Sequence, residues 1–559
     1  MRNLFLAAIL AGTAMPATAI SLVEERGLSD YVQGRYASAN GDLGRAAELF
    51  EDALGYAPRE PHLLKITFEL AIGSGDEDLA VGAARRLASD GSSDSGLHML
   101  LAADALKRRK WDVLERNMMA LEATGFGALA APIVEAWTLE ARGKSKAARA
   151  LLTAEAPDGF AGTYWAEHRG HLALASGKEE EAIAAYRTLI TDDEGRNSRI
   201  RIALAQALQE QGDEAEALRI LEEARSHPDV TEAKSRLGAD KDIDFAPDDA
   251  RAGMATLLLR MSADLSRDRA APIALTFARI ATWLDPDDAS GWLMVSQILA
   301  RGEQYEGALA AARQVGADDP AAGLARAQEA ALLTALERET EALAMLEAAA
   351  ASSTPTSEDF VRLGDAYQGE DRFAEAITAY RRALEIDTDN DEVVWQTWFL
   401  IGAAEEQNGD WQAAEVALRM ALKLSPEQAI TLNYLGYTLL DRGVKQDEAI
   451  ELIEEAHRLE PNDGHITDSL GWAEYRLGQY EKAVETLEAA IADVPDDATI
   501  NDHLGDAYWQ VGRHIEARFR WQAALLGEPT EEQVEAINAK LTYGYERGVV
   551  MAEAAQPAS

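Results

Sequence analysis

Large apolar and small residues recur along this chain with a period of 34 residues, most clearly toward the C-terminus. Two consecutive series are Leu470, Gly471, Ala483, Leu487, Ala490 and Pro495, and then Leu504, Gly505, Ala517, Trp521, Ala524 and Pro529. The last apolar positions of each series are spaced by four and three residues, as on one face of an α-helix. Each period therefore predicts two amphipathic helices joined by a turn.

The residue type at each place has a physical reason. A glycine at the Leu-Gly place lets the two helices of one unit approach closely, and the alanine early in the second helix fills the same contact. We expect the large residue four positions later to pack into the following unit and the proline to end the helix. Because one unit cannot bury its apolar face alone, neighbouring units must stack.

Weaker versions of the series extend upstream to Gly34, and the segments that begin near Pro61, Ser95 and Leu129 keep only its spacing. The period gives about 14 units in all. Three segments interrupt the register, at 227–253, 352–357 and 387–392, and the first of these is rich in aspartate. The last helical pattern, at 531–546, is more polar, as expected of a cap that protects a solenoid end.

This series resembles the tetratricopeptide repeat, whose pattern is Trp or Leu, Leu-Gly, Tyr, Ala, an aromatic residue, Ala and Pro at fixed places in 34 residues. The resemblance implies an all-α fold. The fold would be a superhelical solenoid of about 14 helix-turn-helix units with a C-terminal capping helix. It also implies that the first helix of each unit lines a concave groove.

In that geometry, places 2, 5, 9, 12 and 13 of each unit face the groove. In the last four units these places include Phe399, Glu406, Asn433, Tyr437, Asp468, Trp472, Tyr475, Arg476, Asp502, Asp506 and Trp509. Aromatic rings beside carboxylates suit a peptide groove, since the rings supply buried area and the charges select basic partners. The alternative is that Tyr437 and Trp472 simply pack between neighbouring units.

The charge composition limits the classes of partner that the protein can be expected to bind. The 53 Lys and Arg residues against 97 Asp and Glu give a net charge of −44. Nucleic acid and anionic membrane surfaces are therefore disfavoured, because both need clustered cations. The alternative is that the excess negative charge only keeps the protein soluble and selects no partner. The acidic groove lacks the inward Lys, Arg and Asn of the carboxylate clamp in chaperone-binding relatives, so a C-terminal carboxylate ligand is disfavoured.

The N-terminus resembles an export signal. Met1 to Asn3 is a short positive start, Leu4 to Ala14 is apolar, and small residues in an A-x-A pattern precede a cleavage site after Ala19. An uncleaved anchor is the alternative, although the apolar run is short for a membrane span. We expect a periplasmic or secreted protein without an integral membrane segment in the mature chain. Peripheral association with a membrane stays open.

These features divide the chain into five parts. They are a signal peptide at 1–19, an N-terminal array at 20–228, an acidic linker at 229–254, a C-terminal array at 255–529, and a capping helix with a disordered tail at 530–559.

No catalytic constellation, metal site or cofactor motif is recognisable. The chain has no cysteine. His168 and His171 share a helix face, but no third ligand accompanies them, so surface histidines are the simpler interpretation. Asp387 to Asp391 starts like a calcium loop but lacks glycine at the sixth place. Repeats fill nearly the whole chain and leave no room for a catalytic domain, so we expect no enzyme.

The segments Asn433–Tyr437, Asp468–Trp472 and His503–Asp506 resemble a bacterial envelope group of tetratricopeptide proteins. Some of these hold substrates for a periplasmic C-terminal-processing protease. The lipid-bearing cysteine of those relatives is missing here. The resemblance implies an exported adaptor or scaffold that binds proteins or peptides in its groove, for envelope protein assembly or proteolysis. The alternative is a permanent structural component of an envelope complex.

Overall fold

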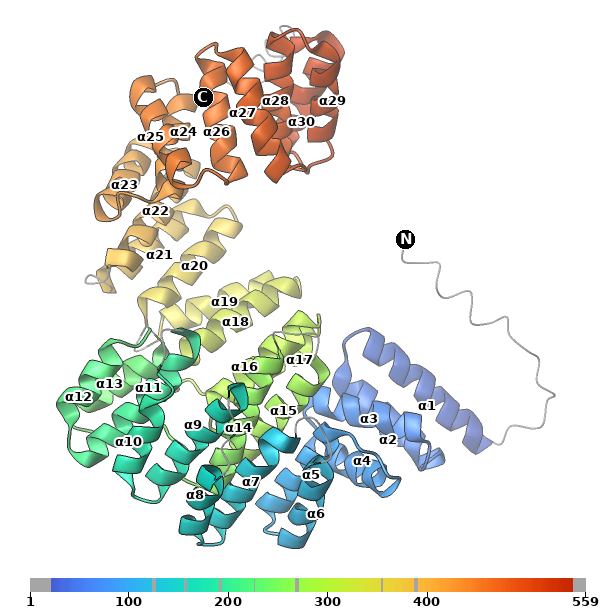
Figure 1. The fold of residues 1–559 in the computed structure, drawn as a ribbon. Helices are drawn as coiled ribbons and strands as arrows, with labels where there is room; N and C mark the ends of the chain where they lie inside the picture. Colours follow the sequence, from blue (N-terminus) through green and yellow to red (C-terminus); the bar gives the residue numbers. More distant parts are fainter. Residues whose placement is uncertain are drawn as a thin grey trace. The chain divides into compact units, whose positions relative to one another are not determined.

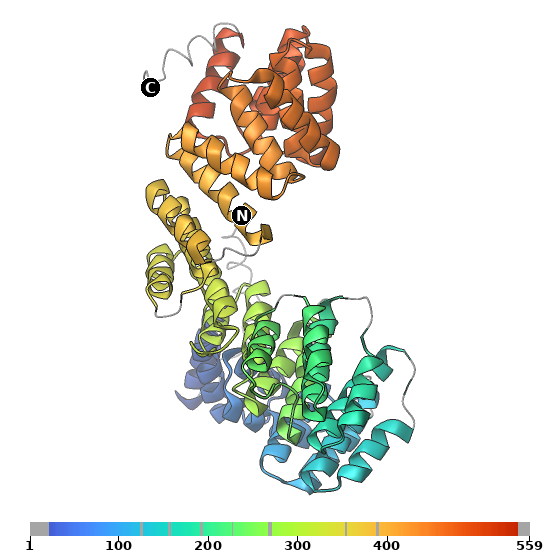
Figure 2. The same ribbon diagram turned by 90° about the vertical axis from the view of Figure 1, so that its left-hand side faces the viewer.

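The computed structural model describes residues 22–545, apart from short gaps at 123–126, 155–156, 158, 191–193, 226, 267–270, 353–354 and 387–390. The predicted signal peptide, the acidic joint at 387–390 and the C-terminal tail therefore lie outside the described residues. The described residues form thirty α-helices and no strand (Figure 1; Figure 2). The chain divides into two compact units, each made of many repeats. The first unit ends at Ala342 and the second unit begins at Leu343.

The first unit contains helices α1 to α18 and the start of α19. Their bounds are α1 Leu22–Ala39, α2 Leu43–Tyr56, α3 Pro61–Ser74, α4 Glu77–Ser89, α5 Ser95–Lys107, α6 Trp111–Glu122, α7 Gly127–Ala141, α8 Ser145–Ala154, α9 Phe160–Ala175, α10 Glu179–Arg187, α11 Glu194–Gln211, α12 Glu214–Glu222, α13 Pro228–Gly238, α14 Ala250–Leu265, α15 Ala271–Leu284, α16 Ala289–Arg301, α17 Tyr305–Ala312, α18 Ala322–Ala335 and α19 Glu339–Ala350.

The second unit contains the remaining helices. Their bounds are α20 Ser357–Gly369, α21 Phe373–Ile386, α22 Asp391–Gln407, α23 Trp411–Leu424, α24 Ala429–Asp441, α25 Gln446–Leu459, α26 Gly464–Arg476, α27 Tyr480–Asp493, α28 Ala498–Gln510, α29 His514–Ala524 and α30 Glu531–Tyr543. None of the described helices of either unit is both long and apolar enough to cross a bilayer.

The helices follow one another as helix-turn-helix pairs, with α13 and α30 outside the pairs. A Gly-Asp turn recurs between the two helices of a pair. At Gly41 and Gly409 the φ angles are +78° and +85°, which glycine adopts without the penalty of a side chain. The following aspartates, Asp42 and Asp410, accept hydrogen bonds from the first turn of the second helix. Some of the chain's many aspartates therefore serve as N-caps of helices.

The repeat glycines stand where the sequence pattern predicts a close approach. A Cβ atom added at Gly364 would lie 2.4 Å from Tyr380, and one added at Gly505 would lie 2.5 Å from Trp521. Each of these large residues was expected to pack into the following unit. The structure places both rings against the glycine of their own repeat, because the missing Cβ leaves a slot that an aromatic ring fills, and Trp521 also stacks on Tyr545 of the following segment, as expected.

In the first unit, α14 and α15 pack against the first helices of earlier pairs. Helix α14 contacts α5, α7 and α9, and α15 contacts α3 and α5 (Figure 1). Gly253 of α14 fits directly against Trp137 of α7, where a Cβ would lie 2.1 Å from the indole. The buried Arg279 of α15 donates hydrogen bonds to the carbonyl oxygens of Ile72 and Gly73, at 3.0 and 2.9 Å. These first helices were expected to line an open groove, and the chain's own helices cover them.

The segment predicted as an acidic linker is held by hydrogen bonds. Helix α13 occupies its first part, and an irregular stretch follows to α14. The backbone N–H of Ile243 donates to Gln209 of α11 at 2.7 Å, and that of Ala246 donates to Gln206 at 2.8 Å. Both apolar side chains are buried. This stretch therefore packs on the first unit.

Candidate functional site

The first helices of four successive pairs in the second unit, α22, α24, α26 and α28, border an open hollow of about 410 Å³, which we name the acidic groove. It is lined by Glu406, Asn433, Tyr434, Tyr437, Thr438, Asp441, His465, Asp468, Ser469, Asp497, Thr499 and Ile500. Of the residues predicted for the groove, the structure brings together Glu406, Asn433, Tyr437 and Asp468. Phe399 of α22 packs edge-on against Tyr434, with ring centroids 5.6 Å apart.

Carboxylates dominate the wall of the acidic groove. Glu406, Asp441, Asp468 and Asp497 contribute four acids, and His465 is the basic residue among those that line it. Glu406 is paired with Arg442 at 3.0 Å, and His465 lies 4.0 Å from Asp497. Burial raises the pKa of the Tyr437 phenol, and the nearby acids add to the shift. The groove therefore offers a negative surface with two tyrosine rings and suits a cationic partner.

Trp472 lies inside a stack rather than free in the groove. Its ring is stacked on Tyr475 at 4.8 Å and on His503 of α28 at 4.0 Å. His503 Nδ1 lies 3.0 Å from the carboxylate of Asp468. Burial alone would lower the pKa of His503, but the charge and hydrogen bond of Asp468 outweigh it and raise the pKa. Asp468, Trp472 and Tyr475, all predicted for the groove, therefore help to hold α26 against α28.

Contacts with α29, with α30 and with Tyr545 after it engage most of the remaining predicted residues. The buried Lys540 of α30 bonds to the carboxylates of Asp502 and Asp506 at 2.8 to 2.9 Å. Tyr545 shares a hydrogen bond of 2.5 Å with the hydroxyl of Tyr475. Trp509 stacks on His514, with centroids 4.2 Å apart. The predicted groove is thus occupied at its C-terminal end, and Arg476 stays exposed.

Sequence reasoning missed several residues of the acidic groove, among them Tyr434, Asp441, His465 and Asp497. The signal lies in the spacing of α24, where Asn433, Tyr434, Tyr437 and Asp441 follow one helical face. The places taken from the repeat family describe this face only to within one residue.

His168 and His171, expected at the surface, are buried in the first unit. His168 Nδ1 accepts from the indole N–H of Trp137 at 3.1 Å, and Tyr186 is hydrogen-bonded to His171 at 2.8 Å. Burial lowers the pKa of His168 to about 3. Across the described residues, no group of three or more His, Asp or Glu side chains could hold a metal ion. His168 and His171 therefore belong to the core of the first unit, because α9 lies between α7 and α10.

Comparisons with known proteins agree with the repeat pattern. Family models described as "Tetratricopeptide repeat" match residues 31–96, 173–235, 361–429 and 399–463, and one described as "TPR repeat" matches 471–512. The TPR repeat-containing protein PA4667 of Pseudomonas aeruginosa is 46% identical over 74 residues, which are 13% of this chain and 12% of that protein.

Solved structures give a looser likeness. The crystal structure of the APC/C hetero-tetramer Cut9-Hcn1 matches at 15% identity with a TM-score of 0.39, over 93% of this chain and 96% of that chain. A crystal structure of MamA matches at 25% identity with a TM-score of 0.25, over 30% of this chain and 94% of that chain. The repeat series, the helix pairs and the family matches together identify the chain as a tetratricopeptide-repeat protein with an all-α solenoid fold.

Proposed function

We propose that this protein is an exported adaptor that holds a basic segment of a partner protein in the acidic groove of its second unit. A tetratricopeptide solenoid is a scaffold for protein–protein interaction. The observation that carries the finer proposal is that Glu406, Asp441 and Asp497 line one hollow together with Tyr434 and Tyr437. Rings supply buried contact area, and carboxylates orient and select cationic side chains.

The first unit is a weaker candidate for this role. Its first helices α3, α5, α7 and α9 are covered by α14 and α15, so a partner would have to displace them. The acidic groove needs no such displacement. The export part of the proposal rests on the pattern of residues 1–19, and a role in envelope assembly or proteolysis rests on the resemblance of the C-terminal units.

The groove is tested with a charge-matched pair of variants. Asp441→Lys reverses a charge inside the acidic groove, and Glu451→Lys makes the same change at an exposed position of α25 outside it. Partners captured from an envelope extract of the source organism are identified by mass spectrometry, purified and titrated against both variants. We expect Asp441→Lys to weaken binding and Glu451→Lys to retain it, with binding that falls as salt is raised. Equal binding by both variants would contradict the proposal.

Export is tested separately by N-terminal sequencing of the protein recovered from the periplasm or medium. A mature chain that starts at Ile20 is expected. A full-length protein confined to the cytoplasm would contradict export and leave the groove assignment untouched.

A further inference from the structure

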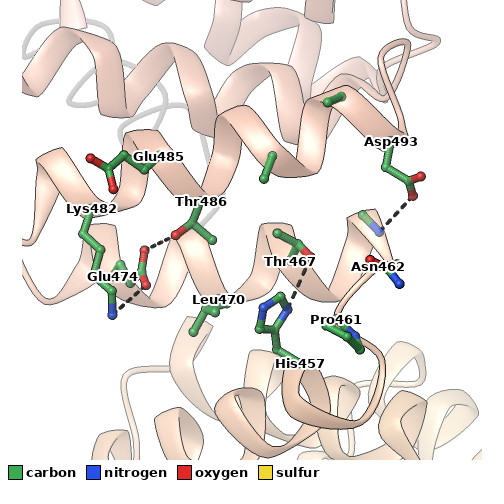
Figure 3. A pocket seen from close by; sticks show the side chains of 13 residues that line it. His457, Pro461, Asn462, Thr467, Leu470, Glu474, Lys482, Glu485, Thr486 and Asp493 are labelled. Atoms are coloured by element: carbon green, nitrogen blue, oxygen red, sulfur yellow. Dashed lines mark hydrogen bonds and ion pairs between the residues drawn. The ribbon is translucent and has the colours of Figure 1, made fainter.

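A second hollow, of about 680 Å³, opens between the end of α25, helix α26 and helix α27 (Figure 3). We name it the α26–α27 cleft. Its residues on α26 are Gly464, Thr467, Leu470 and Glu474, whereas the acidic groove uses His465, Asp468 and Ser469 of the same helix. Because each residue turns a helix by about 100°, these two sets lie on different faces of α26. The cleft is therefore a separate surface.

The repeat provides an internal comparison for the side of α26 that borders the cleft. In three other pairs of the second unit, the residue three places after the repeat glycine bonds to the second helix of the preceding pair. These bridges join Tyr367 to Glu347 at 2.8 Å, Glu405 to Arg381 at 2.6 Å, and Tyr508 to Glu488 at 2.7 Å. Each bridge ties neighbouring pairs together on this side of the first helix.

In α26 the corresponding residue is Glu474, and the residue twenty positions earlier, where Tyr367 and Tyr508 find their partners, is Glu454. Two carboxylates repel each other, so this bridge cannot form in the same way. Glu474 instead accepts from the hydroxyl of Thr486 at 2.7 Å and lies 3.0 Å from the Lys482 ammonium, both on α27 (Figure 3). Glu474 is therefore bonded to α27 within its own pair; in the α24 pair the corresponding residue is the buried Leu439, which forms no polar bridge either.

Glu474 is a cation acceptor that the fold holds in place. Its side chain is 4% exposed, whereas the side chain of Lys482 is 60% exposed. A buried carboxylate is costly without a compensating cation, and the exposed Lys482 is a cation that a partner's side chain can replace. An arginine would improve on it, since a guanidinium presents two parallel N–H donors to one carboxylate.

The remainder of the cleft suits an extended chain. Leu470, Ala489 and Ala492 line it with apolar atoms, and Glu485 and Asp493 add two more carboxylates. The stretch of α27 from Lys482 to Asp493 is about 16 Å long at 1.5 Å per residue. That is the length of about five residues of extended peptide.

We propose that the α26–α27 cleft binds an extended peptide segment of a partner protein, with an arginine or lysine side chain seated at Glu474 and small apolar residues over Ala489 and Ala492. This site deepens the proposed role as an adaptor but does not depend on the acidic groove. Two separate sites in one unit would let the protein hold two segments at once, which raises the effective concentration of the second.

The test uses the full mature chain and a labelled pentapeptide with arginine at both ends and alanine between them, followed by fluorescence anisotropy. A peptide with glutamine in place of arginine is the matched control ligand. Ala489→Trp fills the cleft from an exposed position, and Glu485→Lys reverses one of its charges without touching the buried Glu474. Circular dichroism of each variant establishes that the helices are retained.

We expect saturable binding of the arginine peptide, at least tenfold weaker binding by either cleft variant, and binding within twofold of wild type for Glu451→Lys, which lies on α25 outside both the cleft and the acidic groove. Failure of the wild type to bind the arginine peptide, equal binding of the glutamine peptide, or unchanged binding by both cleft variants would overturn the proposal. Loss in Asp441→Lys alone would assign the peptide to the acidic groove and overturn the cleft while supporting the proposed function.

Discussion

The ammonium of Lys540 lies 2.8 Å from both carboxylate oxygens of Asp506, and both side chains are nearly inaccessible to solvent. Asp502 shares the same ammonium, and Trp521 donates its indole N–H to Asp506 at 2.9 Å. Burial raises the pKa of Asp506 to about 6, although the Lys540 charge opposes the shift. The position of α30 on α28 therefore depends on one cation that compensates two acids.

Lys540→Met is expected to destabilise the C-terminal end of the second unit. Removing one partner of a buried charge pair costs about 3–5 kcal/mol, because the other charge stays buried without compensation. Urea unfolding followed by hydrogen exchange in α28 to α30 measures the loss. The variant should regain stability as the pH falls toward 5, because an uncompensated Asp506 takes up a proton. Adding Asp506→Asn, which keeps an acceptor for Trp521, should recover part of the loss at pH 7. A Lys540→Met protein with unchanged protection in α30 would refute this account.

The His503 and Asp468 pair predicts a loss of stability at alkaline pH. The pKa of His503 is raised in the folded state, so the folded protein binds this proton more tightly than the unfolded chain. The stabilisation is complete below about pH 6.5 and is lost as the pH rises through the folded pKa. Unfolding of the second unit, measured from pH 6 to 9, should show this decline. His503→Gln should flatten the slope, and an equal slope in wild type and variant would exclude His503 as its source.

The first unit should show the opposite trend because of His168. Burial lowers the pKa of this imidazole to about 3, with Glu167 and His171 of α9 and Arg260 of α14 around it. Between the unfolded and the folded pKa values, His168 is protonated in the unfolded chain and neutral in the folded unit. Stability is present above about pH 6.5 and is lost as the pH falls through the unfolded value toward the folded one. His168→Gln keeps an acceptor for Trp137 and should reduce the acid lability by a few kcal/mol at pH 4. Identical acid unfolding curves for the two proteins would contradict the assignment.

The sequence pattern predicts the local part of this fold and only some of its long-range contacts. The glycines at 364 and 505 mark close approaches between helices of one pair, and their place in the repeat reveals them. The contact between Gly253 and Trp137 spans more than a hundred residues, and no periodicity reports it. Lys540 likewise appears in a polar helix, and only the folded chain shows that it neutralises Asp502 and Asp506 of the predicted groove. The predicted residues Asn433 and Tyr437 lie in the acidic groove because repeat register fixes the face of a first helix to within one position.

The packing of α14 onto the first helices of earlier pairs is tested by two glycine-to-alanine substitutions. A Cβ at Gly253 would lie 2.1 to 2.5 Å from indole atoms of Trp137, whereas a Cβ at Gly82 of α4 meets no atom within 4 Å. Gly82→Ala should therefore stabilise the unit by about 0.5–1 kcal/mol, as expected for alanine in a helix. Gly253→Ala should destabilise it by about 1–3 kcal/mol, the usual cost of overpacking a core.

Hydrogen exchange localises the effect of the two glycine variants. Gly253→Ala should lower protection in α7 and α14, because the ring of Trp137 must move away from α14, and it should leave the helices of the second unit unchanged. Gly82→Ala should leave protection in α7 and α14 at the wild-type level. If Gly253→Ala kept full protection in both helices, the close contact between α14 and α7 would be wrong. The first helices of the first unit would then be open to partners, and they would become the next surface to test with the charge-reversal strategy used for the acidic groove.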